Sequence, residues 1–374
     1  MTVAKAKLLG QTGPALADTF VPKPACLATV EPQSVEFLYL DQEAVLAAGL
    51  LDMPRAMEIV GKAQLSYATG KVIEPYKVVL RPEDTVESEE RGRLNGLFAW
   101  ISEPIPEVGM KWIASFPANR RKGLPRASAL ITLNSPETGV PIAVMDGTLI
   151  SAMRTGAMTA LGVQFLAPRK TRKIGVIGAG VQSRTQILGL FTALPKVQEI
   201  AIVNRDLSHS EAVAEECRVR WGAPTHAVKS VDEALADADV ALTATTSHQP
   251  VMFARQIKPG ALTVQIAGHE CEFAVLQQCK KIVTDDWAVV KHRGIMTPAL
   301  MYQQGLLRDQ DIYASVGELI LGLKPGREND AERIHYAHMG MGVDDISLAY
   351  DIYQNALERD LGTKMSLWKK PLWI

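Results

Sequence analysis

The chain has 374 residues, more than one ordinary hydrophobic core organises, so we expect two domains. Its 40 basic and 41 acidic residues give a formal net charge of −1, which favours neither nucleic acid nor a membrane surface as a partner. No apolar run approaches the roughly 18–20 residues that a bilayer span needs, and residues 1–24 lack the compact apolar core of a signal peptide. We therefore expect a cytoplasmic protein.

The first part of the chain predicts a helix followed by a meander of strands. Residues 1–35 are rich in Pro, Ala and Thr and are expected to form a loose lead-in. A helix is predicted over residues 54–69, with Asp52 as its N-cap and Pro54 in its first turn. Segments of strand character, separated by Pro- and Gly-rich turns, follow at residues 76–80, 96–101, 108–116, 127–134 and 141–146.

From residue 173 to about 286 the pattern changes to strands that alternate with helices. Strands are predicted at 174–177, 199–203, 240–243, 262–266 and 282–284, and helices at 182–194, 208–221 and 230–236. This rhythm predicts an α/β fold with a Rossmann-type, doubly wound parallel sheet. A last helix over residues 346–358 is expected to fold back onto the first domain. The predicted domains are therefore 36–155, completed by 340–374, and a dinucleotide-binding domain over 156–339.

The first strand of the second domain runs into a glycine turn. Gly178 permits a tight turn, and Gly180 lets the backbone approach a pyrophosphate at the positive end of the next helix, beside Val181 and Gln182. Ser183 replaces the third glycine of the usual G-x-G-x-x-G pattern, so the support comes from the strand before the turn and the helix after it. The turn predicts a dinucleotide cofactor. A cofactor-free α/β unit is the alternative.

The end of the second strand bears on the choice of cofactor. NAD-preferring proteins carry an acidic residue there that binds the ribose 2′-hydroxyl, whereas this chain reads Asn204-Arg205-Asp206. Because Arg205 could pair with a 2′-phosphate, we favour NADP over NAD. In the alternative interpretation, Arg205 stacks on adenine and Asp206 binds the hydroxyl.

Several motifs, in order along the chain, carry a family resemblance. They are residues 109–115, residues 126–134, residues 151–157, the glycine turn and residues 339–347. Over roughly residues 50–360 the chain resembles the ornithine cyclodeaminase/μ-crystallin family. Within the family it is similar to the siderophore-biosynthesis branch, whose dehydrogenases oxidise N-(1-amino-1-carboxyethyl-2-yl)-glutamate to 2-oxoglutarate and 2,3-diaminopropionate. The resemblance implies a nicotinamide cofactor, a small amino-acid substrate and a homodimer formed through an α+β substrate-binding domain.

The resemblance also implies a site for the substrate carboxylate. Arg154 matches the family's carboxylate-binding arginine, and its planar fork suits a carboxylate. Lys111 matches the substrate-binding lysine, and its apolar neighbours are expected to lower its pKa, which suits a catalytic role near an amine or imine. The alternatives are an edge-strand lysine that extends its ammonium to solvent for Lys111 and a structural ion pair for Arg154. Arg126 is a candidate second carboxylate ligand for a dicarboxylic or tricarboxylic substrate. A surface salt bridge is the alternative for Arg126.

Proton transfer is expected from the loop after the fifth strand. Glu270 falls where the family has its catalytic aspartate, and His269 is the competing base. Further cofactor contacts are expected from Thr155, Thr245, Met341 and Gly342, with Met339 and Met341 forming an apolar wall beside the nicotinamide. No metal is expected, because His335 and His338, three apart on a possible helix face, lack a third ligand.

These residues together predict an NAD(P)-dependent dehydrogenase that acts on the C–N bond of an amino acid or imine. Three alternatives stay open. They are a cyclodeaminase-type lyase, a reductive opine- or ketimine-forming enzyme, and a non-catalytic NADP-binding protein.

Overall fold

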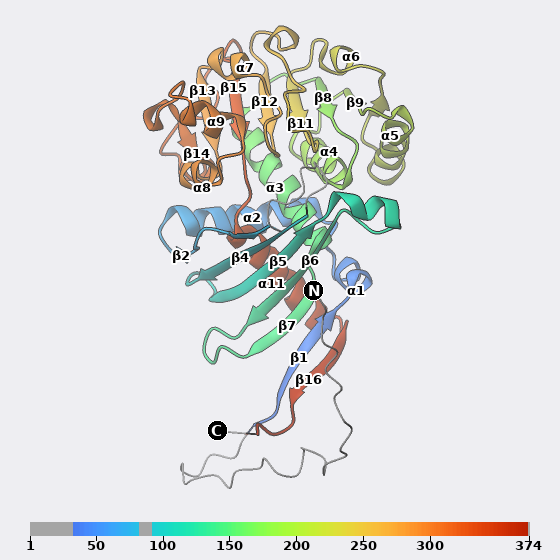
Figure 1. Cartoon of the computed structure of the whole chain (residues 1–374), viewed down its shortest axis with the longest axis vertical. Coiled ribbons are helices and arrows are strands. Elements are labelled where there is room, and N and C mark those ends of the chain that lie inside the picture. The colour runs from blue at the N-terminus through green and yellow to red at the C-terminus, as the bar shows by residue number, and fades with distance from the viewer. Residues whose placement is uncertain (1–32, 82–91, 373–374) are drawn as a thin grey trace, which may run out of the picture.

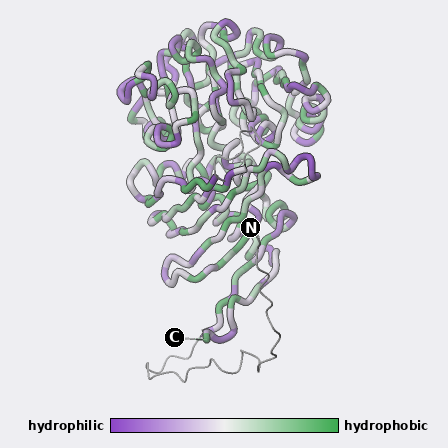
Figure 2. Tube along the Cα trace, in the orientation of Figure 1, coloured by the Kyte–Doolittle hydropathy of each residue, from purple (hydrophilic) through white to green (hydrophobic). Residues whose placement is uncertain are grey.

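The computed structural model describes residues 33–81 and 92–372, so residues 1–32 of the predicted lead-in lie outside the described residues. The described part contains two eight-stranded sheets. The two sheets lie one above the other along the long axis of the molecule (Figure 1). Hydrophobic residues follow the strands of both sheets, and hydrophilic residues gather on the outer helices and loops (Figure 2).

The upper sheet is parallel throughout and confirms the predicted doubly wound α/β fold. Its strand order is β10-β9-β8-β11-β12-β15-β13-β14, and the direction of winding reverses between β8 and β11. Its inner strands are short apolar runs buried on both faces, as parallel strands covered by helices should be. The strands are β8 (Lys173–Ile177), β9 (Glu199–Val203), β10 (Thr225–Ala227), β11 (Val240–Thr243), β12 (Leu262–Gln265), β13 (Lys281–Thr284), β14 (Ala314–Ser315) and β15 (Ile334–Ala337).

Helices on both faces of this parallel sheet follow the predicted alternation. The predicted ones are α4 (Val181–Ala193), α5 (Leu207–Trp221) and α6 (Val231–Leu235). Short elements that the sequence pattern did not predict follow: η2 (Ala254–Gln256), α7 (Phe273–Gln277), α8 (Trp287–Arg293), α9 (Thr297–Gln303), η3 (Asp309–Asp311) and α10 (Val316–Ile320).

The lower sheet is mixed, with the order β16-β1-β7-β6-β5-β4-β2 and with β3 on β4. The predicted meander is confirmed, because β4 to β7 pair antiparallel in chain order. β1 and β16 were not predicted; they pair with each other and extend away from the parallel sheet (Figure 1). The elements are β1 (Val35–Leu40), α1 (Gln42–Ala47), β2 (Val72–Ile73), β3 (Val78–Leu80), β4 (Arg93–Ile101), β5 (Glu107–Ser115), η1 (Pro117–Lys122), β6 (Ala127–Asn134), β7 (Pro141–Asp146) and β16 (Thr363–Trp368).

Two helices cover one face of the mixed sheet. α2 (Met53–Ala68) begins as predicted, with the Asp52 side chain accepting a hydrogen bond from the Arg55 amide at 3.0 Å. α11 (Gly342–Glu358) packs on β4, β5 and β6, as expected for a helix that folds back. It begins four residues before the prediction, because the Glu74 carboxylate accepts hydrogen bonds from the amides of Gly342 and Val343.

The helix α3 (Thr148–Leu166) runs from the mixed sheet into the parallel half (Figure 1). It packs on α4 through glycines. A Cβ added at Gly156 would lie 2.4 Å from the Thr185 carbonyl oxygen, and one at Gly189 would lie 2.5 Å from the Gly156 carbonyl oxygen. The two backbones therefore touch, and α3 fixes the mixed sheet against the helix that follows the glycine turn.

Candidate functional site

The glycine turn has the geometry that a dinucleotide needs. Gly178 has φ +110°, and a Cβ there would lie 2.3 Å from the Ala244 carbonyl oxygen, so only glycine fits. A Cβ added at Gly180 would meet no heavy atom within 4 Å, which leaves the N-terminus of α4 open to a pyrophosphate.

Ser183 explains the missing third glycine of the motif. Its hydroxyl donates to the Gly178 carbonyl at 2.8 Å and accepts from the Gly180 amide at 3.2 Å. It therefore closes the turn from inside. Val181, also predicted at the cofactor, is 54% exposed at the start of α4. The Gln182 Oε1 is buried and has no partner among the described residues. The turn fits a dinucleotide.

The segment after β9 places the three residues of the expected ribose site. Arg205 is exposed, and no described carboxylate lies within ion-pair distance of its guanidinium. Asp206 caps α5, since its carboxylate accepts from the Ser208 amide at 3.0 Å and from the Ser208 hydroxyl at 2.7 Å. These hydrogen bonds lower the pKa of Asp206. Asn204 donates a long hydrogen bond, 3.4 Å, to the Asp206 carbonyl oxygen. The acid nearest the ribose position is thus already engaged.

Lys111 and Arg154 meet on one buried carboxylate. The Lys111 ammonium, on β5, donates to Asp345 Oδ2 and to the Ser151 hydroxyl at 3.0 Å. The Arg154 Nε, on α3, donates to Asp345 Oδ1 at 3.0 Å. The three charged side chains are at most 7% exposed. Sequence reasoning found the lysine and the arginine but missed Asp345, which lies at the start of α11.

Burial sets the electrostatics of this cluster. Burial and then the Arg154 guanidinium lower the pKa of Lys111, and Asp345 opposes the shift. Burial also disfavours the charged form of Arg154, but the carboxylates of Asp345 and Asp344 outweigh it and raise its pKa. Burial raises the pKa of Asp344 to about 7.

Arg154 keeps one donor free for a ligand. Its Nη1 is buried and has no hydrogen-bond partner in the described part of the chain. It lies against Gly340, where a Cβ would come within 1.9 Å of it. The Gly340 amide, with that of Met339, donates to the buried Asp285 carboxylate, so the backbone beside the guanidinium is fixed. Burial raises the pKa of Asp285 to about 6.

Lys77 is a third cation at this place, and sequence reasoning missed it. Its ammonium donates to the Gly340 carbonyl oxygen at 3.3 Å. Burial, followed by the charge of Arg154, lowers the pKa of Lys77 to about 8. The signal in the sequence was slight, because a single lysine in a strand segment is usually exposed.

Glu270 lies after β12, where the proton-transfer residue was predicted, but its carboxylate is fully engaged. Oε1 accepts from the Thr245 amide at 2.7 Å and the Thr245 hydroxyl at 2.6 Å, and Oε2 accepts from the Thr243 hydroxyl and the Ala267 amide. Burial raises its pKa despite these donors. Its contacts are those of a side chain that ties two loops together, and its catalytic role stays a prediction.

His269 differs from its neighbour. It is half-buried, its Nε2 has no partner among the described residues, and its ring lies 5.5 Å from that of Phe273. Burial lowers the pKa of His269, so the ring is neutral near pH 7 and able to accept a proton.

The other predicted cofactor residues lie in more enclosed positions. Thr155 is buried and donates to the Ser151 carbonyl, and Thr245 is held by Glu270. Met341 is fully buried in the core, with its sulfur 3.7 Å from the Gln64 amide nitrogen, and the Gly342 amide is bound by Glu74. Cofactor contacts for these residues stay predictions, and the packing of Met341 does not favour an exposed wall.

The two histidines lie at β15, so the premise that they share a helix face is wrong. His335 is in the strand and His338 follows it, and each ring is within 2.9 Å of a threonine hydroxyl. In the two described stretches no three His, Cys, Asp or Glu side chains gather as metal ligands. No helix of those stretches combines the length and the apolar character that crossing a membrane requires.

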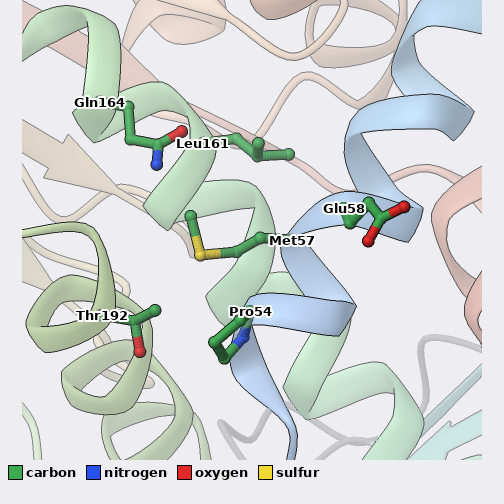
Figure 3. A pocket seen from close by; sticks show the side chains of 6 residues that line it. All are labelled: Pro54, Met57, Glu58, Leu161, Gln164 and Thr192. Atoms are coloured by element: carbon green, nitrogen blue, oxygen red, sulfur yellow. The ribbon is translucent and has the colours of Figure 1, made fainter.

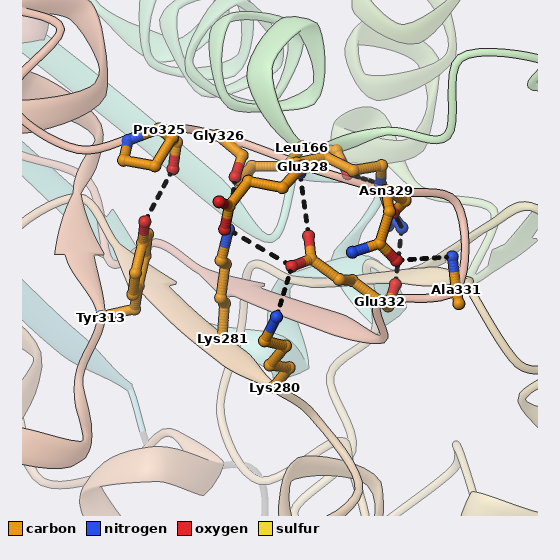
Figure 4. Close-up of polar contacts among 11 residues, drawn as sticks. Leu166, Lys280, Lys281, Tyr313, Pro325, Gly326, Glu328, Asn329, Ala331 and Glu332 are labelled. Atoms are coloured by element: carbon orange, nitrogen blue, oxygen red, sulfur yellow. Dashed lines mark hydrogen bonds and ion pairs between the residues drawn. The ribbon is translucent and has the colours of Figure 1, made fainter.

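Two further features lie apart from the turn and the cluster. A shallow cavity of about 340 Å³ is lined by Met57, Leu161, Thr192 and their neighbours on α2, α3 and α4 (Figure 3). An ion-pair network joins Lys281 on β13 to Glu328 at 2.7 Å and to Glu332 at 3.5 Å (Figure 4). It anchors the loop before β15.

Comparison with known proteins identifies the family to which this architecture belongs. The profile of the ornithine cyclodeaminase/mu-crystallin family matches residues 40–360. The chain belongs to this family. An alanine dehydrogenase of Archaeoglobus fulgidus is 34% identical over 90% of this chain and 100% of its own length. The N-((2S)-2-amino-2-carboxyethyl)-L-glutamate dehydrogenase of Staphylococcus aureus is 30% identical over 89% of this chain and 99% of its own.

Solved structures of the family agree with the fold. The Thermococcus litoralis Δ1-pyrroline-2-carboxylate reductase, in complex with NADH and L-proline, superposes with a TM-score of 0.81 at 28% identity, covering 87% of this chain and 99% of that one. An archaeal alanine dehydrogenase dimer with bound NAD gives a TM-score of 0.80 at 32% identity, covering 89% and 100%.

Proposed function

We propose that this member of the family is an NAD(P)-dependent dehydrogenase that oxidises the C–N bond of an N-substituted amino acid. The product is an imine, which water hydrolyses to a 2-oxo acid and an amino acid. N-(1-amino-1-carboxyethyl-2-yl)-glutamate is the substrate that we propose. The observation that carries the proposal is the buried cluster of Lys111, Arg154 and Asp345, in which Arg154 keeps a free donor beside Gly340.

The relatives support the reaction class. The names of the alanine dehydrogenase and of the carboxyethyl-glutamate dehydrogenase both state an amino acid or an N-substituted amino acid as the compound that is oxidised. The Thermococcus reductase was solved with proline, an amino acid of the same kind. The 34% identity to the alanine dehydrogenase exceeds the 30% identity to the glutamate-derived enzyme, so identity alone does not choose the substrate.

Each residue of the candidate site has a separate role in the proposed reaction. The free Nη1 of Arg154 binds the α-carboxylate and thereby orients the Cα hydrogen. Lys77, which lies beside Arg154 at Gly340, adds a second donor for that carboxylate, and Lys111 holds the Asp345 carboxylate against Arg154. A dinucleotide held at the glycine turn would supply, through its nicotinamide, the acceptor for the hydride. His269 removes the proton from nitrogen or from the attacking water, in preference to the fully engaged Glu270.

Turnover of the cofactor separates this proposal from its alternatives. We would screen amino acids, N-substituted amino acids and pairs of oxo acids with amines, and follow the absorbance of the reduced nicotinamide. Net reduction of the cofactor by an N-substituted amino acid supports the proposal. Net oxidation alone indicates a reductive opine or ketimine enzyme, product without net redox change indicates a cyclodeaminase, and silence throughout indicates a binding protein.

NADP is the cofactor that we propose, over NAD. Arg205→Ala should weaken NADP(H) binding by about 10–100-fold and leave NAD(H) nearly unchanged, because one charge-assisted phosphate contact is worth roughly 1.5–3 kcal/mol. Titration of both cofactors by protein fluorescence measures this. Arg220→Ala is the control, since Arg220 lies in the last turn of α5, the helix that follows Arg205. Equal losses for both cofactors in Arg205→Ala would mean that this arginine does not bind the phosphate.

A homodimer is proposed through the uncovered face of the mixed sheet. The helices cover the face that carries Lys111, and the opposite face presents apolar side chains in neighbouring registers. Phe98, Trp100 and Leu130 are 39%, 42% and 49% exposed on it. A patch of this kind marks an interaction surface, and the archaeal relative is a dimer.

Trp100→Lys is expected to convert the dimer to a monomer, because it places a charge in the apolar contact. Sedimentation velocity at micromolar protein would show the loss of the dimer mass. Val219→Lys, at an exposed position on α5, should leave the dimer intact. A monomeric parent protein, or a Trp100→Lys variant that still dimerises, would rule out this face.

A further inference from the structure

A second group of cations lies beyond the carboxylate cluster. Arg93 is the first residue of β4, and Arg126 directly precedes β6. Both strands flank β5, where Ser115 pairs with Arg93 on one side and with Ala127 on the other. The two arginines therefore lie at the same end of three adjacent strands. Figure 2 shows the hydrophilic η1, which connects β5 to β6 at this end.

Neither arginine behaves as an ordinary surface residue. Each is half-buried, and the Nε of each is buried without a hydrogen-bond partner among the described residues. No carboxylate of those residues lies within ion-pair distance of either guanidinium. Burial lowers the pKa of Arg93 and of Arg126, and neighbouring arginines lower both further. Holding desolvated like charges together is costly unless an anion joins them.

Arg293 joins this group from the other half of the molecule. It is the last residue of α8, and the ring of the preceding His292 stacks on Tyr76 at 4.1 Å. Burial and then the charge of Arg93 lower the pKa of Arg293 to about 10. The charge of Arg293 also lowers the pKa of Lys77, whose ammonium donates to the Gly340 carbonyl oxygen. Arg293 therefore lies close enough to both Arg93 and Lys77 for the three charges to act on one another.

The strand register relates Arg93 to Lys111. Lys111 pairs with Leu97, and Arg93 lies four residues before Leu97 on the same strand. Because side chains alternate, Arg93 and Lys111 belong to the same face of the sheet, whereas Arg126, next to Ala127, starts from the opposite face at the end of its strand. Four residues of strand separate the two backbone positions by about 13 Å, and the long arginine side chain shortens this gap for a substrate with a distal carboxylate.

We propose that Arg93 and Arg293, with the charge of Arg126 from the end of the next strand, form a second anion subsite that binds a distal carboxylate of the substrate, so that the enzyme selects di- or tricarboxylic substrates and products over monocarboxylic ones. The inference rests on the proposed function for the placement of the first carboxylate at Arg154. It adds the residues that discriminate by charge at the far end.

Calorimetric titration with two oxo acids tests the subsite without turnover. The full chain, saturated with reduced cofactor, is titrated with 2-oxoglutarate and with 2-oxopentanoate, which has the same carbon number but no distal carboxylate. We expect 2-oxoglutarate to bind about tenfold or more tightly, as one or two charge-assisted contacts predict. Arg93→Gln and Arg126→Gln should each reduce this preference to about threefold or less and leave 2-oxopentanoate binding unchanged.

Controls separate the possible outcomes. Arg308→Gln, at an exposed arginine paired with Asp311, should keep the full preference. Arg126→Lys should restore part of it, since charge returns without the fork. Equal binding of the two acids by the parent protein, or a full preference in both glutamine variants, would overturn the subsite. A preference that persists when no amino acid gives net cofactor turnover would refute the proposed reaction and leave the subsite standing.

Discussion

His269→Asn is expected to lower kcat by about 10²–10⁴-fold, the usual worth of a positioned acid–base group, with folding and cofactor binding intact. The reason is that Nε2 of this half-buried ring is unpartnered at the carboxyl edge of the parallel sheet, where ligands of such folds bind. Because burial lowers the pKa of His269, the active neutral form should persist below the usual histidine range. The fall of kcat/KM on the acidic side of its pH profile should therefore occur at a pH below the usual histidine range, and it should be absent in the variant.

Glu270→Gln is the companion measurement. It replaces one acceptor oxygen of a carboxylate that takes four hydrogen bonds, so the free energy of unfolding should fall by about 1–3 kcal/mol. Thermal denaturation measures the loss, and kcat of the folded fraction should fall far less than in His269→Asn. A Glu270→Gln variant that melts normally but is inactive, beside an active His269→Asn, would return the proton-transfer role to the glutamate.

Arg154→Lys should lower kcat/KM by about tenfold or more while the affinity for the cofactor stays the same. Lysine keeps the charge but loses the fork, so it cannot bind Asp345 through one nitrogen and the substrate through another. Steady-state kinetics and cofactor titration measure the two quantities.

Arg55→Lys is the matched control for this change. Arg55 binds the Asp351 carboxylate through two nitrogens at 2.7 and 2.8 Å, away from the cluster, so the substitution removes the same kind of fork. It should leave kcat/KM unchanged. Unaltered kcat/KM in Arg154→Lys would exclude direct binding of the substrate carboxylate by Arg154.

The part of the fold that was predicted correctly is the part with a regular hydrophobic pattern in the sequence. The alternation of apolar strands with helices is a local signal, and it placed β8, β9, β11 and the helices between them within a few residues. α3 gave no such signal, because it is buried on nearly every side and has no polar stripe. The start of α11 was placed too late because its cap, Glu74, comes from a segment far away in the sequence.

In the candidate site, too, the residues that depend on long-range contacts were not predicted. Lys111 and Arg154 were found because each lies in a motif that resembles the family. Asp345, which joins them, and Lys77, which lies beside them at Gly340, depend on contacts between β5, α3, α11 and the segment before β3. A single sequence does not reveal that these meet. The choice between Glu270 and His269 likewise depends on which side chain the loops already engage.

The glycine contact between α3 and α4 bears on how this enzyme can be redesigned. Because the backbones touch at Gly156 and Gly189, direct backbone contact sets the spacing between the glycine turn and Arg154. Residues 204–206 are at the end of β9, outside that contact. On the proposed assignment, cofactor preference can therefore be exchanged there without moving Arg154, whereas enlarging either glycine would shift the glycine turn and Arg154 at once.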